Sequence, residues 1–131
     1  LWEYMGTIMQ HPTLSGELFA FIRMLVSVDQ RCAYCIDINE GMLINQYGVS
    51  AEVVHAVREN PTEAPLTDKE KGLLLLALMA ARDSNSVTVE NIQSVRDLGC
   101  SDSEIYDAVG HAANQVWGDI MLNTFKVERD H

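Results

Sequence analysis

The sequence lacks several features that would point to a common class of protein. Its 131 residues contain nine Lys and Arg against nineteen Asp and Glu, a formal net charge of −10. A surface with so few cations repels phosphate backbones and anionic lipids, so we expect no nucleic-acid or membrane partner. The longest apolar run, residues 72–81, has about half of the ~20 residues that span a bilayer. The N-terminal residues also lack the basic start and long apolar stretch of a signal peptide.

Cysteine and proline are scarce as well. The three cysteines are an odd number, which argues against a secreted disulfide scaffold and favours a cytoplasmic protein. The three prolines mark loops, and two of them fall in residues 60–65. This short segment separates two halves that are each too small to build a good core alone, so the sequence predicts a single domain over residues 1–131.

The pattern that is present is helical. Apolar residues recur at three- and four-residue spacing, and no alternating strand with a hairpin turn is found, so we predict an all-α fold of about six helices. Ser50 is a predicted N-cap, and Thr67 with Glu70 and Ser101 with Glu104 have the spacing of capping boxes. The expected helices cover approximately residues 14–25, the cysteine pair to 47, 50–57, 67–82, 88–98 and 102–125.

One of these helices is apolar on every face. It contains the run from Leu73 to Met79. A helix without a polar face must be covered all round. The simplest cover for the face that its own core leaves open is a second copy of the chain, which predicts a homo-oligomer.

Two of the cysteines form the motif Cys32-Ala33-Tyr34-Cys35. At the start of a helix, two cysteines with this spacing lie close enough to form a disulfide, and the free backbone amides and the helix dipole stabilise a thiolate. Arg31 adds positive charge beside Cys32, whereas Asp29 and Asp37 add negative charge. The acidity of the thiols is therefore left open by the sequence.

Three interpretations of this motif compete. A structural zinc site needs four ligands, and the chain has neither a second such motif nor a close histidine pair, so we expect no metal unless Cys100 and a distant histidine complete the set. The thiols are otherwise inert core residues or a redox-active dithiol. The motif alone does not choose between the last two.

The context of the motif resembles the carboxymuconolactone decarboxylase/alkyl hydroperoxidase D (AhpD) family. The resemblance rests on residues 25–37, on the capping box at Thr67 with the apolar helix after it, and on residues 98–105, and it covers about residues 14–127. It implies an oligomeric all-helical domain that reduces hydroperoxides with its dithiol and no other cofactor. In peroxidase-type members the second cysteine attacks the peroxide and the first resolves the sulfenic acid as a disulfide, which a thiol protein reduces. These roles would fall to Cys35 and Cys32.

The sequence departs from the family at its proton relay. Peroxidase-type members carry a Glu twelve residues before the first cysteine and a His four residues after the second, and these positions are Ala20 and Asn39 here. Neither side chain exchanges a proton near neutral pH, so we expect weak peroxidase activity or thiol–disulfide exchange at Cys32 and Cys35, with a hydroperoxide or a disulfide as the substrate. Glu17, Tyr34 and Asn39 are the candidate auxiliary residues, with Glu17 one turn before Ala20 as the best substitute for the missing carboxylate.

Two other functions stay open. Decarboxylase-type relatives act on a lactone acid without a cysteine pair, but this chain shows no cluster of basic residues for such a substrate. A redox-sensing or purely structural oligomer is the other alternative, and burial of both sulfurs would favour it. Of the remaining residues, His111 is expected to be buried, Cys100 to be structural, and Trp2 and Trp117 to be packing anchors.

Overall fold

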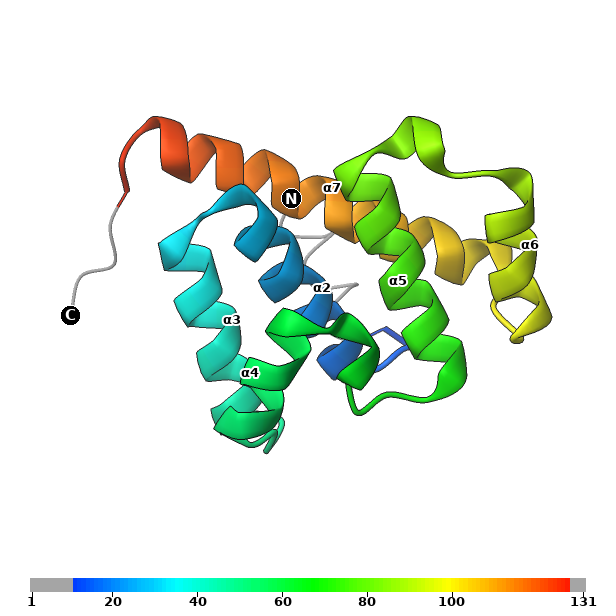
Figure 1. The fold of residues 1–131 in the computed structure, drawn as a ribbon, viewed down its shortest axis with the longest axis horizontal. Helices are drawn as coiled ribbons and strands as arrows, with labels where there is room; N and C mark the ends of the chain where they lie inside the picture. The colour runs from blue at the N-terminus through cyan, green and yellow to red at the C-terminus, as the bar shows by residue number, and fades with distance from the viewer. Residues whose placement is uncertain (1–10, 128–131) are drawn as a thin grey trace.

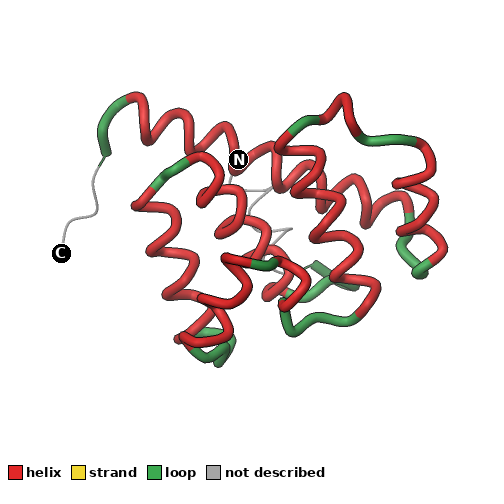
Figure 2. The backbone as a smooth tube through the Cα atoms, viewed as in Figure 1, coloured by secondary structure: helices red, strands yellow, loops and turns green. Residues whose placement is uncertain are grey.

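All regular backbone structure in the described part of the chain, residues 11–127 of a computed structural model, is helical (Figures 1 and 2). The predicted all-α class is therefore confirmed. Within these residues no helix combines the length and the apolar character that crossing a membrane requires. The elements in chain order are α2 (Gly16–Gln30), α3 (Ala33–Asn45), α4 (Ala51–Glu59), the 3-10 turn η1 (Pro61–Glu63), α5 (Asp68–Arg82), the 3-10 turn η2 (Ser84–Ser86), α6 (Val89–Asp97) and α7 (Asp102–Thr124).

Hydroxyl side chains begin most of these helices. The N-cap side chains of Ser15, Ser50, Thr67, Thr88 and Ser101 each accept a hydrogen bond from a backbone amide of the first turn. The capping box of Ser101 and Glu104 is complete, as predicted. The box predicted at Thr67 forms only in part. The carboxylate of Glu70 accepts instead from the backbone N–H of Ser15 at 2.8 Å and from its hydroxyl at 2.7 Å, which joins the start of α5 to the start of α2.

Helix α2 is the centre of the fold. Every residue from Leu18 to Ser27 is buried, and the helix contacts α3, α5 and α7 (Figure 1). The sequence predicts that the core of one chain leaves part of the apolar helix α5 open, and Leu75 and Met79 on α5 are 38% and 37% exposed. The apolar run of α2 is interrupted by Arg23, so its sequence looks less uniform than that of α5. Its burial follows from the three helices around it.

Helix α7 crosses both α2 and α5, and its contact face includes two small side chains. Ala108 and Ala112 are buried there and let the neighbouring helices approach closely. Several bulky side chains of α7 lie outside this face, among them Trp117, which is 57% exposed. The prediction that Trp117 is a packing anchor is therefore wrong, and Trp2 lies outside the described residues.

The start of α7 is held by one buried carboxylate, that of Glu104. It accepts from Lys69 Nζ at 2.9 Å, from Thr13 Oγ1 at 2.8 Å and from the backbone N–H of Ser101 at 2.8 Å. Burial alone raises the pKa of Glu104, but the hydrogen bonds from Ser101, Lys69 and Thr13 and the charge of Lys69 outweigh it and lower the pKa to about 2. A depressed pKa stabilises the folded chain above the pKa of the unfolded state, and this stabilisation is lost as the pH falls toward 2.

We therefore predict that Glu104→Gln lowers the free energy of unfolding at pH 7 by about 2–3 kcal/mol. The difference between the variant and the native chain should shrink as the pH falls from about 4.5 to about 2, because the native carboxylate becomes protonated there. Urea unfolding at several pH values measures it. Glu90→Gln, at an exposed first-turn position of α6, is the control, and equal effects of the two substitutions would contradict the prediction.

Candidate functional site

The cysteine pair lies where α2 turns into α3. Arg31 ends α2 in the left-handed conformation with φ of 56°, and the N–H of Cys32 donates to the carbonyl of Ser27 at 3.0 Å. This closing pattern reverses the chain within two residues. Cys32 is the N-cap of α3 and Cys35 lies in its first turn. The predicted position of the motif at a helix start is confirmed.

The two sulfurs are adjacent, but only one of the two cysteines borders the neighbouring cavity. Their Sγ atoms are 2.8 Å apart as free thiols, compared with the ~2.05 Å of a disulfide. Cys32 is 1% exposed and Cys35 is 6% exposed. A cavity of about 230 Å³ has Cys35 in its wall, and Cys32 does not line it. Cys35 is therefore the cysteine of the pair that a small molecule in this cavity contacts.

A buried carboxylate from the far end of the chain stands beside the thiols. Asp119 on α7 is fully buried, and one of its oxygens lies within 4.8 Å of both Sγ atoms. It accepts from the Ser27 hydroxyl at 3.0 Å and from Gln115 Nε2 at 2.8 Å. These two donors hold the carboxylate in place between α2 and α7, next to the sulfurs.

The surroundings keep Cys35 protonated. Burial raises the pKa of the Cys35 thiol far above its usual value, and the hydrogen bonds to Cys32 and Asp119 together with the negative charge of Asp119 raise the pKa further. The helix dipole of α3 acts in the opposite direction and does not prevail. Asp29, one of the two acidic residues near the motif in sequence, is engaged elsewhere, because it accepts from Arg82 Nε at 2.6 Å.

The two positions of the family's proton relay are filled differently here. Ala20 is fully buried in the core. Asn39 is buried, and its Nδ2 donates to the backbone carbonyl of Cys35 at 2.8 Å. Its Oδ1 accepts from Arg23 Nε at 2.8 Å. An amide in this arrangement positions α3 against α2 and transfers no proton.

The other sequence candidates fall at different distances from the thiols. Glu17 lies in the first turn of α2, ten residues before Ser27, which is about 15 Å along the helix. The structure therefore does not bring Glu17 to the cysteines. Tyr34 is half-buried and lines the cavity beside Cys35. His111 is buried, as expected, and its ring contacts Arg23 rather than the thiols.

The thiols and Asp119 also form a group of potential metal ligands, the one such group found within residues 11–127. Tetrahedral zinc bound at ~2.3 Å to two thiolates would hold the sulfurs about 3.8 Å apart. The observed separation is 2.8 Å, and Cys100 is distant, with its thiol 3.6 Å from the carbonyl of Lys69. The arrangement thus fits a dithiol better than a metal centre.

Asp119 is the site residue that sequence reasoning missed. One signal for it exists in the sequence. Ala108, Ala112, Gln115 and Asp119 follow one another at three- and four-residue spacing, which places an acidic residue on the apolar face of α7. A carboxylate on the buried face of a helix needs partners there. The sequence cannot show that these partners include Ser27 and the cysteines.

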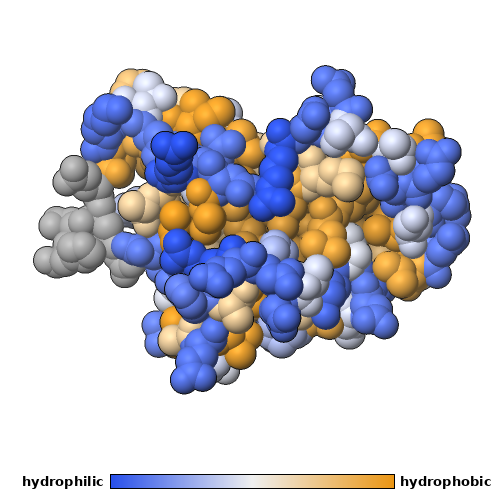
Figure 3. All heavy atoms as spheres, viewed as in Figure 1, coloured by the Kyte–Doolittle hydropathy of each residue, from blue (hydrophilic) through white to orange (hydrophobic). Residues whose placement is uncertain are grey.

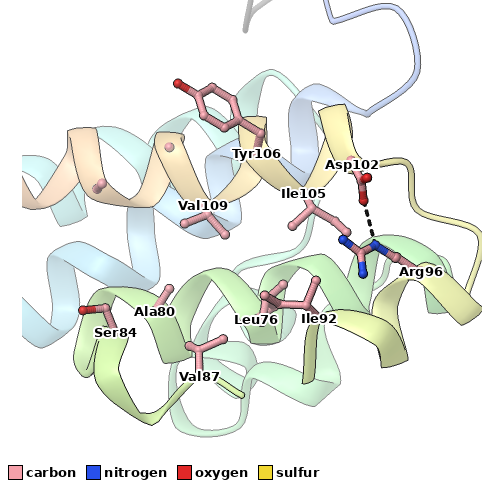
Figure 4. A pocket seen from close by; sticks show the side chains of 12 residues that line it. Leu76, Ala80, Ser84, Val87, Ile92, Arg96, Asp102, Ile105, Tyr106 and Val109 are labelled. Carbon is pink, nitrogen blue, oxygen red and sulfur yellow. Dashed lines mark hydrogen bonds and ion pairs between the residues drawn. The ribbon is translucent and has the colours of Figure 1, made fainter. Parts of the chain in front are cut away.

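A larger cavity, of about 530 Å³, lies between α5, α6 and α7, away from the cysteines (Figure 4). Its walls are mostly apolar, with Leu76, Val109 and Ile92 facing one another across it. At one end Arg96 Nε donates to Asp102 at 2.7 Å. None of its lining residues is a cysteine or a histidine, whereas the smaller cavity is lined by Cys35.

Comparison with known proteins gives structural matches only. No family model and no curated protein sequence matches the chain. An uncharacterized peroxidase-related protein from Silicibacter sp. superposes with a TM-score of 0.86 at 18% identity, over 98% of this chain and 68% of that one. A second such protein, an alkylhydroperoxidase AhpD core from Ralstonia eutropha, gives 0.80 at 22% identity, over 94% and 65% of the two chains.

A third match is a protein of unknown function from Agrobacterium tumefaciens, whose description names the antioxidant defence protein AhpD. It gives a TM-score of 0.80 at 16% identity, over 99% of this chain and 88% of that one. At these identities the matches bear on the fold. The chain therefore has the all-helical AhpD-like fold that its sequence resembles.

Proposed function

We propose that the chain is a thiol-dependent peroxidase that reduces small hydroperoxides at Cys35 and forms a Cys32–Cys35 disulfide. The observation that carries the proposal is the meeting of three groups. Two thiols lie 2.8 Å apart, a buried carboxylate oxygen of Asp119 lies within 4.8 Å of both sulfurs, and a cavity opens onto one of them. A dithiol with a base and access for a small molecule has what peroxide reduction requires.

The reaction proceeds in two steps. Asp119 takes the proton of the Cys35 thiol, and the sulfur attacks the terminal peroxide oxygen. The O–O bond breaks, the leaving alkoxide takes up the proton as an alcohol, and Cys35 becomes a sulfenic acid. The Cys32 thiol then displaces water from this sulfenic acid, which leaves the disulfide. The balance is one hydroperoxide and two thiols converted to one alcohol, one water and one disulfide.

The attacking role goes to Cys35 because it lines the cavity and Cys32 does not. Its raised pKa leaves little thiolate at neutral pH, which slows the attack on the peroxide. Asp119 supplies a carboxylate from α7 where relatives use a Glu on the helix before the motif. Asp119 acts without a histidine partner, so we expect slow turnover. The absence of the relay residues at positions 20 and 39 leads to the same expectation.

The catalytic cycle needs an external thiol reductant, for which a thiol protein is the natural class, and no cofactor beyond the dithiol.

We also propose that the chain self-associates. Leu75 and Met79 on α5 and Tyr106, Trp117 and Ile120 on α7 are partly or largely exposed. Figure 3 shows hydrophobic residues gathered across the middle of one face, between hydrophilic borders. A second copy of the chain is the simplest cover for such surfaces.

The test is a hydroperoxide pulse on the reduced protein, followed by alkylation of remaining thiols and mass spectrometry. We expect the peptide that contains Cys32 and Cys35 to lose two hydrogens and to escape alkylation, while Cys100 stays alkylated. A free dithiol peptide at the same concentration is the control. If the protein dithiol stays reduced when the control is oxidised, the proposed function is wrong.

A redox-sensing module without turnover is the second candidate, because both sulfurs are almost fully buried. It predicts the same disulfide under strong oxidant. The two functions differ in stoichiometry when a dithiol reductant is present. A peroxidase is reduced again by the dithiol and consumes many equivalents of hydroperoxide per chain, whereas a sensor whose buried disulfide the dithiol does not reduce consumes one.

A further inference from the structure

Arg23 is a buried cation in the middle of the most enclosed helix. Its side chain is buried, as are the other residues of α2 from Leu18 to Ser27. Within residues 11–127 no carboxylate forms an ion pair with it, and no carboxylate contributes to the shift of its pKa, which burial lowers. A guanidinium stays charged in proteins, so this position places an uncompensated positive charge inside the fold.

The groups that hold the guanidinium are neutral. Nε donates to Asn39 Oδ1 at 2.8 Å, one terminal nitrogen donates to His111 Nε2 at 3.1 Å, and the other donates to the sulfur of Met42 at 3.0 Å. Burial, and then the charge of Arg23, lower the pKa of His111 to about 3, so the ring is neutral at pH 7 and accepts the bond. These contacts fix the orientation of the guanidinium without balancing its charge.

The guanidinium keeps donors for a ligand. Each terminal nitrogen carries two hydrogens, and the described residues supply one acceptor to each of these nitrogens. Arg23 lines the same cavity of about 230 Å³ as Cys35, together with Asn39 and Met42. The unbalanced charge therefore faces the space that a substrate of Cys35 would occupy.

We propose that this cavity binds a small carboxylate-bearing molecule with its carboxylate on Arg23, and that the hydroperoxide reduced at Cys35 belongs to this class. The second part rests on the function proposed above. Asn39, which Arg23 contacts, is one helical turn from Cys35, about 5–6 Å along α3. The carboxylate would thus lie about one turn from the reacting oxygen, with Tyr34, Ile38 and Met42 against the short body between them.

Alkylation of Cys35 tests carboxylate binding without any peroxide. Iodoacetate and iodoacetamide differ in the carboxylate, and both react with the same thiolate, so their rate ratio cancels the acidity of the thiol. We expect Arg23→Met to lower the iodoacetate-to-iodoacetamide ratio at Cys35 by about tenfold or more, because a charge-assisted hydrogen bond is lost. Arg23→Lys should retain part of the preference. Mass spectrometry assigns the modified cysteine.

Arg96→Met is the matched control, since Arg96 is an exposed arginine that pairs with Asp102 and does not line the cavity of Cys35. Its ratio should equal that of the native chain. In case Arg23→Met does not fold, the native chain supplies a second measurement. Benzoate should slow the alkylation of Cys35 by iodoacetamide to a saturating limit, and benzamide, which has the same shape without the charge, should not.

An unchanged ratio in folded Arg23→Met, or equal effects of benzoate and benzamide on the native chain, would overturn the inference. Failure of the proposed function has a different signature. If the chain prefers iodoacetate through Arg23 but forms no disulfide with hydroperoxide, the carboxylate site is supported and the peroxidase function is contradicted. If the chain forms the disulfide but shows no preference for a carboxylate, the peroxidase function is supported and the proposed substrate class is contradicted.

Discussion

Replacing Cys35 by serine is expected to abolish hydroperoxide consumption, whereas Cys32→Ser should leave one equivalent consumed per chain. The reason is the position of the two sulfurs, since Cys35 lines the cavity and Cys32 lies behind it at 2.8 Å. Without Cys32 the sulfenic acid forms at Cys35 and has no neighbouring thiol to condense with. Trapping with a sulfenic-acid reagent and mass spectrometry, with hydroperoxide measured in parallel, gives both results.

Cys100→Ala is the control for the loss of one buried thiol, because Cys100 contacts the carbonyl of Lys69 far from the pair. Its hydroperoxide consumption should match that of the native chain. The opposite pattern, with a trapped sulfenic acid at Cys32 in the Cys35→Ser variant, would show that the roles of the two cysteines are reversed. If both serine variants consume the same amount of hydroperoxide, the two thiols do not have separate attacking and resolving roles.

Asp119→Asn is expected to slow disulfide formation with hydroperoxide by about 100-fold or more, the range in which a positioned acid–base group acts. The same substitution should speed the alkylation of Cys35 by iodoacetamide at neutral pH. Asp119 raises the pKa of the Cys35 thiol through its hydrogen bond and its charge, so loss of that charge lowers the pKa and increases the thiolate fraction. Stopped-flow oxidation and timed alkylation measure the two rates.

These opposite changes distinguish an acid–base group from a residue that only supports the fold, because the leaving alkoxide needs the proton that Asp119 returns and iodide leaves without one. Asparagine has nearly the same shape as aspartate and still offers an oxygen to the hydroxyl of Ser27, which bonds Asp119 at 3.0 Å. Asp29→Asn is the control, since Asp29 pairs with Arg82 at the surface at 2.6 Å. If both rates rise together in Asp119→Asn, the carboxylate hinders the reaction and is not its base.

Much of the local structure, including the helix start at the cysteine motif, was predictable because interactions between neighbouring residues determine it. The hydroxyl caps at Ser50 and Ser101, the helix start at Cys32 and the end of α7 near Phe125 depend on residues within one turn of each other. Glu70 is the exception. Its carboxylate satisfies the start of α2 rather than its own helix, and a partner 55 residues away is invisible to a local pattern.

The sequence by itself determined an acidic, all-helical chain with two cysteines one turn apart at a helix start, because charge, periodicity and capping are read from neighbouring residues. Only the tertiary structure decided which helix is buried all round and which groups surround the thiols. Asp119 reaches the cysteines from α7, and Arg23 reaches the cavity of Cys35 from α2, because both helices pack against each other at the start of α3. The proton acceptor and the cation are therefore products of packing between distant segments, whose partners no spacing along the chain specifies.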